Sequence, residues 1–311
     1  MNLVHVSVVI PTKDRPDLIG GSVRAVLANT YRSFDVTVVD QSADDRTGEV
    51  VRGLARCDER LRYVHTLPPG LSRAYNVGIG GTAGEIIAFT DDDCVASPDW
   101  IESVVAAFAD EPDAEMLYGQ VLLPQSLVGA PVEVPTLAID RPRRLSARDG
   151  FKVYGMGANF AARRSLFARV GGFDEVLGGG GALRSSQDFD LQFRVFRAGA
   201  VSLLRPEVRV DHYGARTPDQ WPATQRAYGI GDGAFYLKHV RCGDLLALSL
   251  LIRRLGRLSA REALSSLGLR RRPSQRVYLR GVIDGMRASL RFPVDRRDRR
   301  YAPTIAAGVA S

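Results

Sequence analysis

The sequence has little cysteine and no long apolar runs, and each absence excludes a class of protein. Its three cysteines, Cys57, Cys94 and Cys242, show no CxxC spacing, so neither a disulfide framework nor a thiolate zinc site is indicated. The longest strongly apolar run, around residues 245–252, is far shorter than the roughly 20 residues that span a bilayer, and no signal-type segment opens the chain. Internal repeats and low-complexity tracts are lacking too. We therefore expect neither a secreted nor a membrane-spanning protein, and a reducing cytoplasm fits best.

The positive charge of the chain is concentrated at its carboxyl end. The formal net charge of the 311 residues is +7, yet from Arg241 onward there are 16 arginines, no lysine and 5 acidic residues, a net of +11. Residues 1–240 therefore carry a net charge of −4. Because this larger part is slightly acidic and does not interleave basic with aromatic residues, we expect no nucleic-acid partner.

Apolar, β-branched runs alternate with helical patterns through the first third of the chain. The runs predict strands at 4–10, 36–40, 61–65 and 85–90, and the stretches that follow them space apolar residues as helices do. Because the strands are continuously apolar, they predict an α/β fold with a mostly parallel sheet covered by helices on both faces. Ligands of such sheets bind at the carboxyl ends of the strands.

Three adjacent carboxylates, Asp91, Asp92 and Asp93, directly follow the fourth strand. They repel one another and are costly at the rim of a buried sheet unless a positive charge neutralises them. Mn²⁺ or Mg²⁺ is the simplest candidate, because both prefer oxygen ligands and share their coordination with phosphates. Since neighbouring side chains of extended backbone point to opposite sides, Asp91 and Asp93 can face one site while Asp92 faces away. The alternative is a solvated acidic turn that caps the helix after Ser97.

Several stretches resemble, in this order, the family 2 glycosyltransferases of the GT-A fold. They are VSVVIPTKDR at 6–15, VTVVDQS at 36–42, GLSRAYNVGI at 70–79, AFTDDDC at 88–94, GANFAARRSLFARVGGFDE at 157–175 and SSQDFDLQFRVFRAG at 185–199. The resemblance implies a GT-A catalytic domain over 1–238. Its nucleotide-sugar half is 1–123 and its acceptor half 124–238. The resemblance does not cover the carboxyl end, where we expect residues 239–311 to form an arginine-rich, amphipathic helical extension.

The resemblance also implies roles for single residues. Asp91 and Asp93 would hold the metal ion, with His212 as a third ligand, although a lone histidine is often structural. The nucleotide would be bound by Pro11, Thr12, Asp14, Asp40, Arg73, Asn76 and Asp92. The alternative for Asp40 is that it caps a turn. The alternative for Arg73 is that it is an ordinary surface arginine.

Asp188, in the sequence Gln187-Asp188-Phe189-Asp190, matches the family's general base. Inverting sugar transfer needs a carboxylate that takes the proton of the acceptor hydroxyl as its oxygen attacks the anomeric carbon. The alternative for Asp188 is an acid that stabilises a helix N-terminus, and Asp190 is the second candidate for the base.

These features predict a metal-dependent, inverting glycosyltransferase that uses a nucleotide-diphosphate sugar, with UDP as the nucleotide, on an acceptor hydroxyl. A role in cell-surface glycan or glycolipid synthesis would give it a glycan or a lipid-linked acceptor. Three alternatives are a retaining GT-A transferase, a nucleotidyltransferase that releases pyrophosphate, and a non-catalytic binder of sugar nucleotides.

The arginine-rich end carries two apolar stripes at helical spacing. They are Leu245, Leu248, Leu251, Ile252, Leu255 and Leu258, and then Leu279, Ile283, Met286 and Leu290. Arginines flank both stripes, at 253, 254 and 257 and at 276, 280, 287 and 291. Helices of this kind lie on anionic membranes, which would place the enzyme on the inner face of the cytoplasmic membrane. The alternative is that both stripes pack on the rest of the chain.

Overall fold

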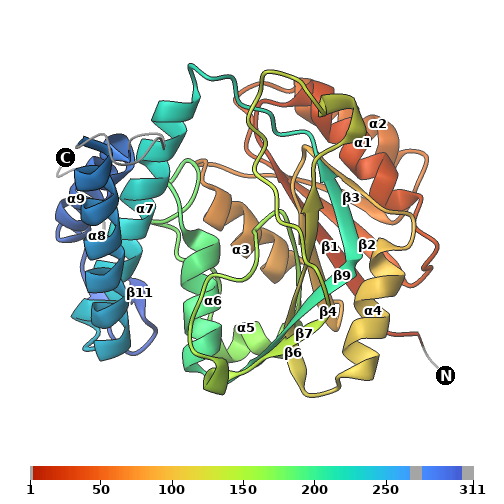
Figure 1. The fold of residues 1–311 in the computed structure, drawn as a ribbon. Coiled ribbons are helices and arrows are strands. Elements are labelled where there is room, and N and C mark those ends of the chain that lie inside the picture. Colours follow the sequence, from red (N-terminus) through yellow and green to blue (C-terminus); the bar gives the residue numbers. More distant parts are fainter. Residues whose placement is uncertain (1–2, 267–274, 303–311) are drawn as a thin grey trace, which may run out of the picture. The chain divides into compact units, whose positions relative to one another are not determined.

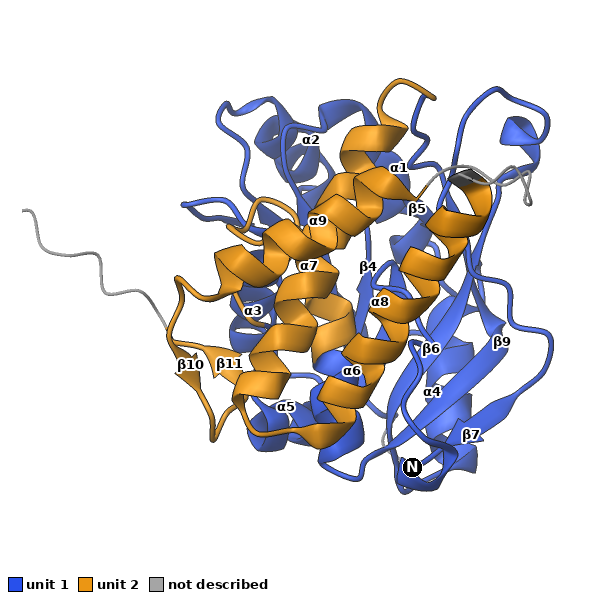
Figure 2. Cartoon of the chain, turned by 60° about the vertical axis from the view of Figure 1, so that its left-hand side comes forward, with its two compact units in different colours: residues 1–173, 191–217 blue, residues 174–190, 218–311 orange. Residues whose placement is uncertain are grey.

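The computed structural model describes residues 3–266 and 275–302, and the chain divides into two compact units. Unit 1 comprises residues 1–173 and 191–217, and unit 2 comprises residues 174–190 and 218–311 (Figure 2). The boundary passes through helix α6 (Gln187–Arg197), so Asp188 belongs to unit 2. The division into domains at residue 238 stays a prediction; that residue lies in the last turn of α7 (Trp221–Arg241).

Unit 1 is built on one sheet (Figure 1). Its strands follow the order β3-β2-β1-β4-β8-β6-β9-β5, with β7 paired to β9. The strands are β1 (Val6–Thr12), β2 (Phe34–Asp40), β3 (Leu61–His65), β4 (Ile86–Thr90), β5 (Cys94–Ala96), β6 (Ala114–Leu122), β7 (Arg143–Leu145), β8 (Asn159–Arg163) and β9 (Val201–His212). All run in one direction except β5, β7 and β8. The predicted α/β fold with a mostly parallel sheet is therefore confirmed.

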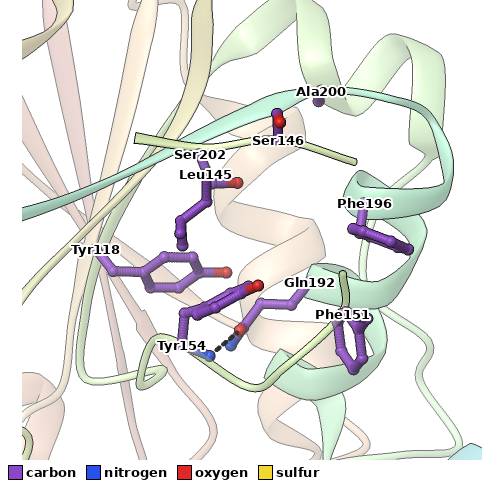
Figure 3. Close-up of a pocket in the computed structure, with 9 residues that line it drawn as sticks. All are labelled: Tyr118, Leu145, Ser146, Phe151, Tyr154, Gln192, Phe196, Ala200 and Ser202. Atoms are coloured by element: carbon purple, nitrogen blue, oxygen red, sulfur yellow. Dashed lines mark hydrogen bonds between the residues drawn. The ribbon is translucent and has the colours of Figure 1, made fainter. Parts of the chain in front are cut away.

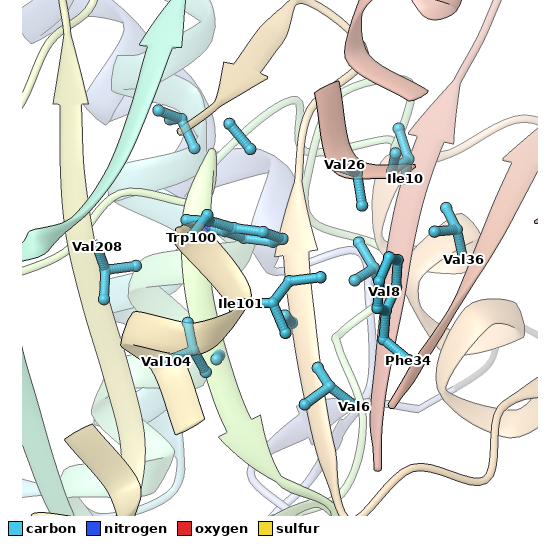
Figure 4. Close-up of a cluster of buried hydrophobic side chains, with 14 of the residues drawn as sticks. Val6, Val8, Ile10, Val26, Phe34, Val36, Trp100, Ile101, Val104 and Val208 are labelled. Carbon is cyan, nitrogen blue, oxygen red and sulfur yellow. The ribbon is translucent and has the colours of Figure 1, made fainter. Parts of the chain in front are cut away.

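Helices cover both faces of this sheet. One face packs against α1 (Pro16–Leu27), α2 (Arg46–Ala55) and α4 (Trp100–Asp110). The other packs against α3 (Leu71–Gly81), α5 (Arg164–Val170) and α6 from Leu191 onward. Val8 and Ile10 enter the first core (Figure 4). Because side chains alternate along a strand, Val9 enters the second. Burial on both faces explains why the sequence shows continuous apolar runs.

Unit 2 consists of α7, α8 (Leu245–Ser266), α9 (Arg276–Ser289), the short pair β10 (Val294–Asp295) and β11 (Arg300–Tyr301), and residues 174–190. Helices α7 and α9 pack backbone to backbone through pairs of glycines four residues apart. The pairs are 229 and 233 in α7 and 281 and 285 in α9. A Cβ on Gly233 would lie 2.0 Å from the carbonyl oxygen of Val282, and one on Gly285 would lie 2.0 Å from that of Ile230. The close approach of these helices therefore depends on glycine.

The predicted apolar stripes of the carboxyl end are divided between the interior and the surface of unit 2. Leu251 and Leu258 are buried, whereas Leu245 and Ile252 have exposed fractions of 79% and 61%. In the second stripe, Ile283 of α9 and Leu290, directly after it, are likewise exposed. Packing thus accounts for only part of the first stripe. Of the helices within the described ranges, none combines the length and the apolar composition that crossing a bilayer requires.

Candidate active site

The carboxyl ends of four codirectional strands of unit 1 carry the polar residues of the candidate site. Thr12 ends β1, Asp40 ends β2, the acidic triplet follows β4, and His212 ends β9. This is the edge at which open α/β sheets bind their ligands. Asp91, Asp92, Asp93 and Thr12 are brought together, as the sequence predicts.

Asp93 and His212 lie side by side because β5 pairs antiparallel with β9, with Cys94 opposite His212. An oxygen of the Asp93 carboxylate is 3.3 Å from Nε2 of His212, and both side chains are buried. Nδ1 of His212 lies 2.8 Å from the carbonyl oxygen of Pro135, to which it can only donate. This contact places a hydrogen on Nδ1 and turns Nε2 toward Asp93. Burial lowers the pKa of His212, but the Asp93 carboxylate outweighs burial and raises it, so a cation bound there would take the place of the proton on Nε2. A histidine held in this way is prepared to bind a metal ion.

The missing side chain of Gly214 keeps this place open. A Cβ at position 214 would lie 2.4 Å from Nε2 of His212 and 2.7 Å from Oδ2 of Asp93. Any other residue would therefore fill the space next to the two atoms best suited to hold a cation. Gly214 was not among the predicted site residues, although a glycine two residues after the candidate histidine is a visible signal.

Arg15 is the cation that meets the acidic triplet in the described structure. Its Nη1 donates to Asp92 at 2.6 Å and to Asp93 at 2.7 Å. The hydroxyl of Thr12 donates to the other oxygen of Asp92 at 2.7 Å. Asp92 thus reaches the same guanidinium as Asp93, and the expectation that it faces away is wrong, because residues 92 and 93 form a turn rather than extended strand. Arg15 lies in the motif VSVVIPTKDR but was not singled out by sequence.

The charges of this cluster suit a divalent cation. Burial and the charge of Asp93 raise the pKa of Asp91 to about 7. Burial alone would raise the pKa of Asp93, but His212 and Arg15 outweigh it and lower the value. Three carboxylates thus share one arginine and one histidine, and additional positive charge would stabilise them. The oxygen and imidazole ligands suit Mn²⁺, and the oxygens also suit Mg²⁺. The residues present therefore fit a divalent metal ion.

Within the described ranges, the group of side chains that could hold a metal ion differs in part from the predicted ligands, because it includes Cys94 and omits Asp91. Asp93, Cys94 and His212 place one ligand atom each within 4.8 Å of one another. The Asp91 carboxylate accepts a hydrogen bond of 3.1 Å from the hydroxyl of Tyr75. Burial raises the pKa of the Cys94 thiol well above its ordinary value, and the side chain packs in the first core. A protonated thiol is a poor ligand for hard cations, so Asp93 and His212 are the better donors.

Hydrogen bonds join the loop after β1 to the loop after β2. Asp40 is fully buried, and its carboxylate accepts from the backbone and hydroxyl of Ser42 and from the hydroxyl of Tyr63. Asp14 accepts from the backbone N–H of Ala43, and its own N–H donates to Ser42. Asp40 therefore has the geometry of a turn cap, and its contact with a nucleotide stays a prediction.

The two predicted residues of α3 differ in their surroundings. Arg73 lies in the first turn of the helix and is partly exposed. Asn76 holds the backbone of Phe173, donating to its carbonyl oxygen at 3.0 Å and accepting from its N–H at 2.7 Å. This contact fixes the loop after α5. Nucleotide contacts of both residues stay predictions, as does that of Pro11, which is buried near the end of β1.

A separate cavity in unit 1 is too small for a sugar nucleotide. It holds about 20 Å³, roughly the space of one water molecule (Figure 3). Its walls come from β6, the segment around β7, α6 and the start of β9: Tyr118, Leu145, Ser146, Phe151, Tyr154, Gln192, Phe196, Ala200 and Ser202. The cluster at the carboxyl ends of the strands, formed by the acidic triplet and His212, is thus the better candidate for the donor site.

The candidate base and its alternative lie in the first turn of α6 with different access to solvent. Asp188 is partly exposed, and its carboxylate accepts from the N–H of Phe189 at 3.0 Å. Asp190 is fully buried, and its Oδ1 lies 2.5 Å from Nζ of Lys238 and 2.8 Å from Nε2 of His239. An acceptor hydroxyl cannot reach a carboxylate enclosed in this way. Accessibility therefore favours Asp188.

Comparison with known families decides which protein family has this site. The sequence model described as "Glycosyl transferase family 2" matches residues 7–171, more than half of the chain. The chain belongs to this family. The glycosyltransferase is 26% identical over 228 residues to the glucosyl-dolichyl phosphate glucuronosyltransferase of Haloferax volcanii, covering 70% of this chain and 72% of that one. It is 27% identical over 248 residues to the pre-mycofactocin glycosyltransferase of Mycobacterium tuberculosis, covering 75% of this chain and 48% of the relative. The chain thus spans about half the length of the latter.

Solved structures share the GT-A fold of this glycosyltransferase. The mannosyltransferase PcManGT from Pyrobaculum calidifontis, in complex with GDP-Man and Mn²⁺, has a TM-score of 0.61 at 18% identity, covering 93% of this chain and 86% of that chain. S. aureus TarS 1-349 in complex with UDP-GlcNAc has a TM-score of 0.55 at 18% identity, covering 73% and 66%. Family membership makes this chain an enzyme of glycosyl transfer. A nucleotidyltransferase and a non-catalytic binder are thereby excluded as alternatives.

Proposed function

We propose that this glycosyltransferase transfers a sugar from a UDP-sugar to an acceptor hydroxyl, with inversion at the anomeric carbon and with the help of a divalent metal ion. The observation that carries the proposal is the buried pair Asp93 and His212 at the carboxyl ends of the strands, with Nδ1 of His212 held by Pro135 and space left beside Nε2 by Gly214. The UDP and UDP-GlcNAc complexes of TarS support UDP as the nucleotide, whereas the GDP-Man complex of PcManGT makes GDP the alternative.

Asp93 and His212, with Asp91, would hold Mn²⁺ or Mg²⁺. A divalent cation bound there supplies positive charge that stabilises the departing diphosphate. Arg15, Thr12 and Asp92 fix the shape of the cluster through their hydrogen bonds.

Asp188 acts as the general base in the proposed reaction. The acceptor oxygen attacks the anomeric carbon from the face opposite the diphosphate, and its proton passes to the Asp188 carboxylate. The bond between the anomeric carbon and the phosphate oxygen breaks, and its electron pair leaves with the nucleoside diphosphate. The product configuration is thereby inverted.

The test is calorimetric titration of the full chain with UDP and with GDP, in Mn²⁺ and in EDTA. We expect UDP to bind in Mn²⁺ and to bind at least tenfold more weakly in EDTA or to the Asp91→Ala/Asp93→Ala variant, because the diphosphate completes the metal shell. UDP binding that is equal in all three cases would contradict the metal assignment. If GDP binds more tightly than UDP, the nucleotide of the donor is GDP and not UDP.

The stereochemistry has its own measurement. NMR coupling constants of the newly formed glycoside identify its anomeric configuration relative to the donor. Inversion supports direct attack with Asp188 as base, and retention would move the enzyme to the retaining GT-A transferases.

We further propose that the acceptor is a lipid-linked or cell-surface glycan reached at the inner face of the cytoplasmic membrane. The exposed apolar residues Leu245, Leu248 and Ile252 form one stripe of α8, and arginines 253 and 257 are exposed near it. Such a surface is complementary to an anionic leaflet. The Haloferax relative, whose name specifies glucosyl-dolichyl phosphate, supports an acceptor of this class.

A further inference from the structure

The segment that carries Asp188 is attached to α7 on the amino-terminal side of that residue. Ser186 is buried, and its hydroxyl donates to Asp232 of α7 at 2.9 Å. Its φ of +66° is a left-handed conformation that costs energy for a residue other than glycine, so the surrounding contacts must impose it. The neighbouring Ser185 packs so tightly on α7 that a Cβ at Gly231 would lie 2.5 Å from its carbonyl carbon.

The same segment is attached to α7 on the other side of Asp188. Asp190 contacts Lys238 and His239, and all three side chains are completely buried. Lys238 also lies 2.6 Å from Asp174, the first residue of the segment. One ammonium group therefore joins both ends of the segment, and Asp188 lies between two fixed points, Ser186 and Asp190.

Stability alone does not account for this arrangement. Removing a lysine, a histidine and two carboxylates from water costs several kcal/mol per ion, and apolar residues of similar size often stabilise a fold equally well. What charged groups add is a single geometry, because each hydrogen bond is directional. The buried contacts thus fix where the segment lies more narrowly than apolar packing would.

We propose that Asp232, Lys238 and His239 of α7 are positioning residues that hold Asp188 in place for proton transfer. This inference rests on the proposed role of Asp188 as the base. A base misplaced by about 1 Å can lose about a hundredfold in rate. The residues assigned to the donor lie in unit 1, and the three positioning residues in unit 2, so loosening the segment affects transfer and leaves UDP affinity unchanged.

Two variants loosen the segment from opposite sides. Ser186→Gly removes the hydroxyl while glycine accepts the left-handed backbone without strain. His239→Leu removes a hydrogen-bond donor to Asp190 at similar volume, and His239→Gln, which retains an N–H donor, is its conservative control. We expect the first two to lower kcat at least tenfold with the KM of the donor and UDP affinity unchanged, and His239→Gln to retain most of the activity.

A double-mutant cycle separates positioning from a general loss of structure. If the variants act through Asp188, they lower kcat no further when combined with Asp188→Asn, because the base is already absent. If either substitution lowers kcat by the same factor in the Asp188→Asn variant as in the native chain, the inference is wrong. An unchanged kcat in both single variants would also overturn it. Should His239→Leu fail to fold, Ser186→Gly decides the question alone. Normal turnover of Asp188→Asn itself would instead remove the proposed base.

Discussion

At the scale of single residues, the candidate metal site depends on a side chain that is missing. Gly214 leaves open the space beside Nε2 of His212 and Oδ2 of Asp93. Its φ lies outside the left-handed region, so another residue could adopt its backbone without strain. The effect of a substitution there is therefore steric and confined to the site.

We expect Gly214→Ala to weaken UDP binding in Mn²⁺ at least tenfold. The added Cβ would approach within 3 Å of both ligand atoms and displace them from the metal. Calorimetry measures the affinity, and Gly80→Ala is the matched control, since a Cβ at that exposed position of α3 meets nothing within 4 Å. Equal affinity of the Gly214→Ala variant and the native chain would mean that the metal lies elsewhere.

Asp188→Asn tests the base directly. The amide keeps the shape of the carboxylate and cannot accept a proton, so we expect turnover to fall by about a hundredfold or more while UDP still binds. Steady-state rates and calorimetry provide the two measurements. A variant with nearly native turnover would transfer the role to another group or point to a retaining mechanism.

The sequence singles out those candidate residues that follow strands, and it does not reveal those that depend on tertiary contacts. Asp91, Asp92 and Asp93 could be predicted because the run before them is unmistakably a strand. Arg15 could not be singled out, because its partners are 77 and 78 residues away. The attachment of Asp190 to His239 spans 49 residues and leaves no local pattern.

At the scale of elements, the packing of α7 on α9 depends on paired glycines. Each helix carries two glycines four residues apart, and a Cβ added to Gly233 would collide with a carbonyl oxygen of α9. Helix α8 also contains a glycine, Gly256, but a Cβ there meets nothing within 4 Å. The two positions offer opposite outcomes for the same substitution.

We expect Gly233→Ala to lower the free energy of unfolding by about 1–3 kcal/mol, as overpacking commonly does. Gly256→Ala should raise it by up to about 1 kcal/mol, because alanine is the better helix former. Urea unfolding followed by circular dichroism measures both values. Equal effects of the two substitutions would show that α7 and α9 do not approach as closely as described.

The elements that sequence analysis missed share a physical reason. Strand β5 has only three residues, too few to show a pattern, and it pairs with β9, more than a hundred residues later. Helix α7 has no single apolar stripe, because it contacts α8, α9 and residues 174–190 on different sides. By contrast β1, β2 and β4 were predictable because both of their faces are buried.

At the scale of the whole molecule, the proposed membrane contact is best tested by point substitutions. Ending the chain near Lys238 would remove α9 and Tyr301, and with them the partners of α7 and of Asp174. Such a truncation would change unit 2 as well as its surface. The exposed residues Leu245 and Ile252 can be changed without disturbing buried contacts.

We expect the native chain to co-sediment with anionic vesicles and to be released by high salt, because arginines near the leaflet contribute about 1 kcal/mol each. Leu245→Glu/Ile252→Glu should lower the bound fraction at least tenfold, since burying each apolar side chain contributes about 1.5–3 kcal/mol. Val128→Glu, at an equally exposed apolar position of unit 1, is the control. Binding that ignores salt, lipid charge and the double substitution would leave α8 as a packing or oligomerisation element.

The hydrogen bond from the backbone of Tyr301 to Asp174 sets an order of events during synthesis of the chain. The two residues are 127 positions apart, which at about 5–20 residues per second corresponds to about 6–25 s of translation. Residues 174–190 leave the ribosome long before α7, α9 and β11 exist to receive them. On the assignments proposed above, a nascent chain acquires its donor-binding strands first and its fixed base last. A chain whose synthesis stops early would therefore hold a sugar nucleotide without being able to pass the sugar on.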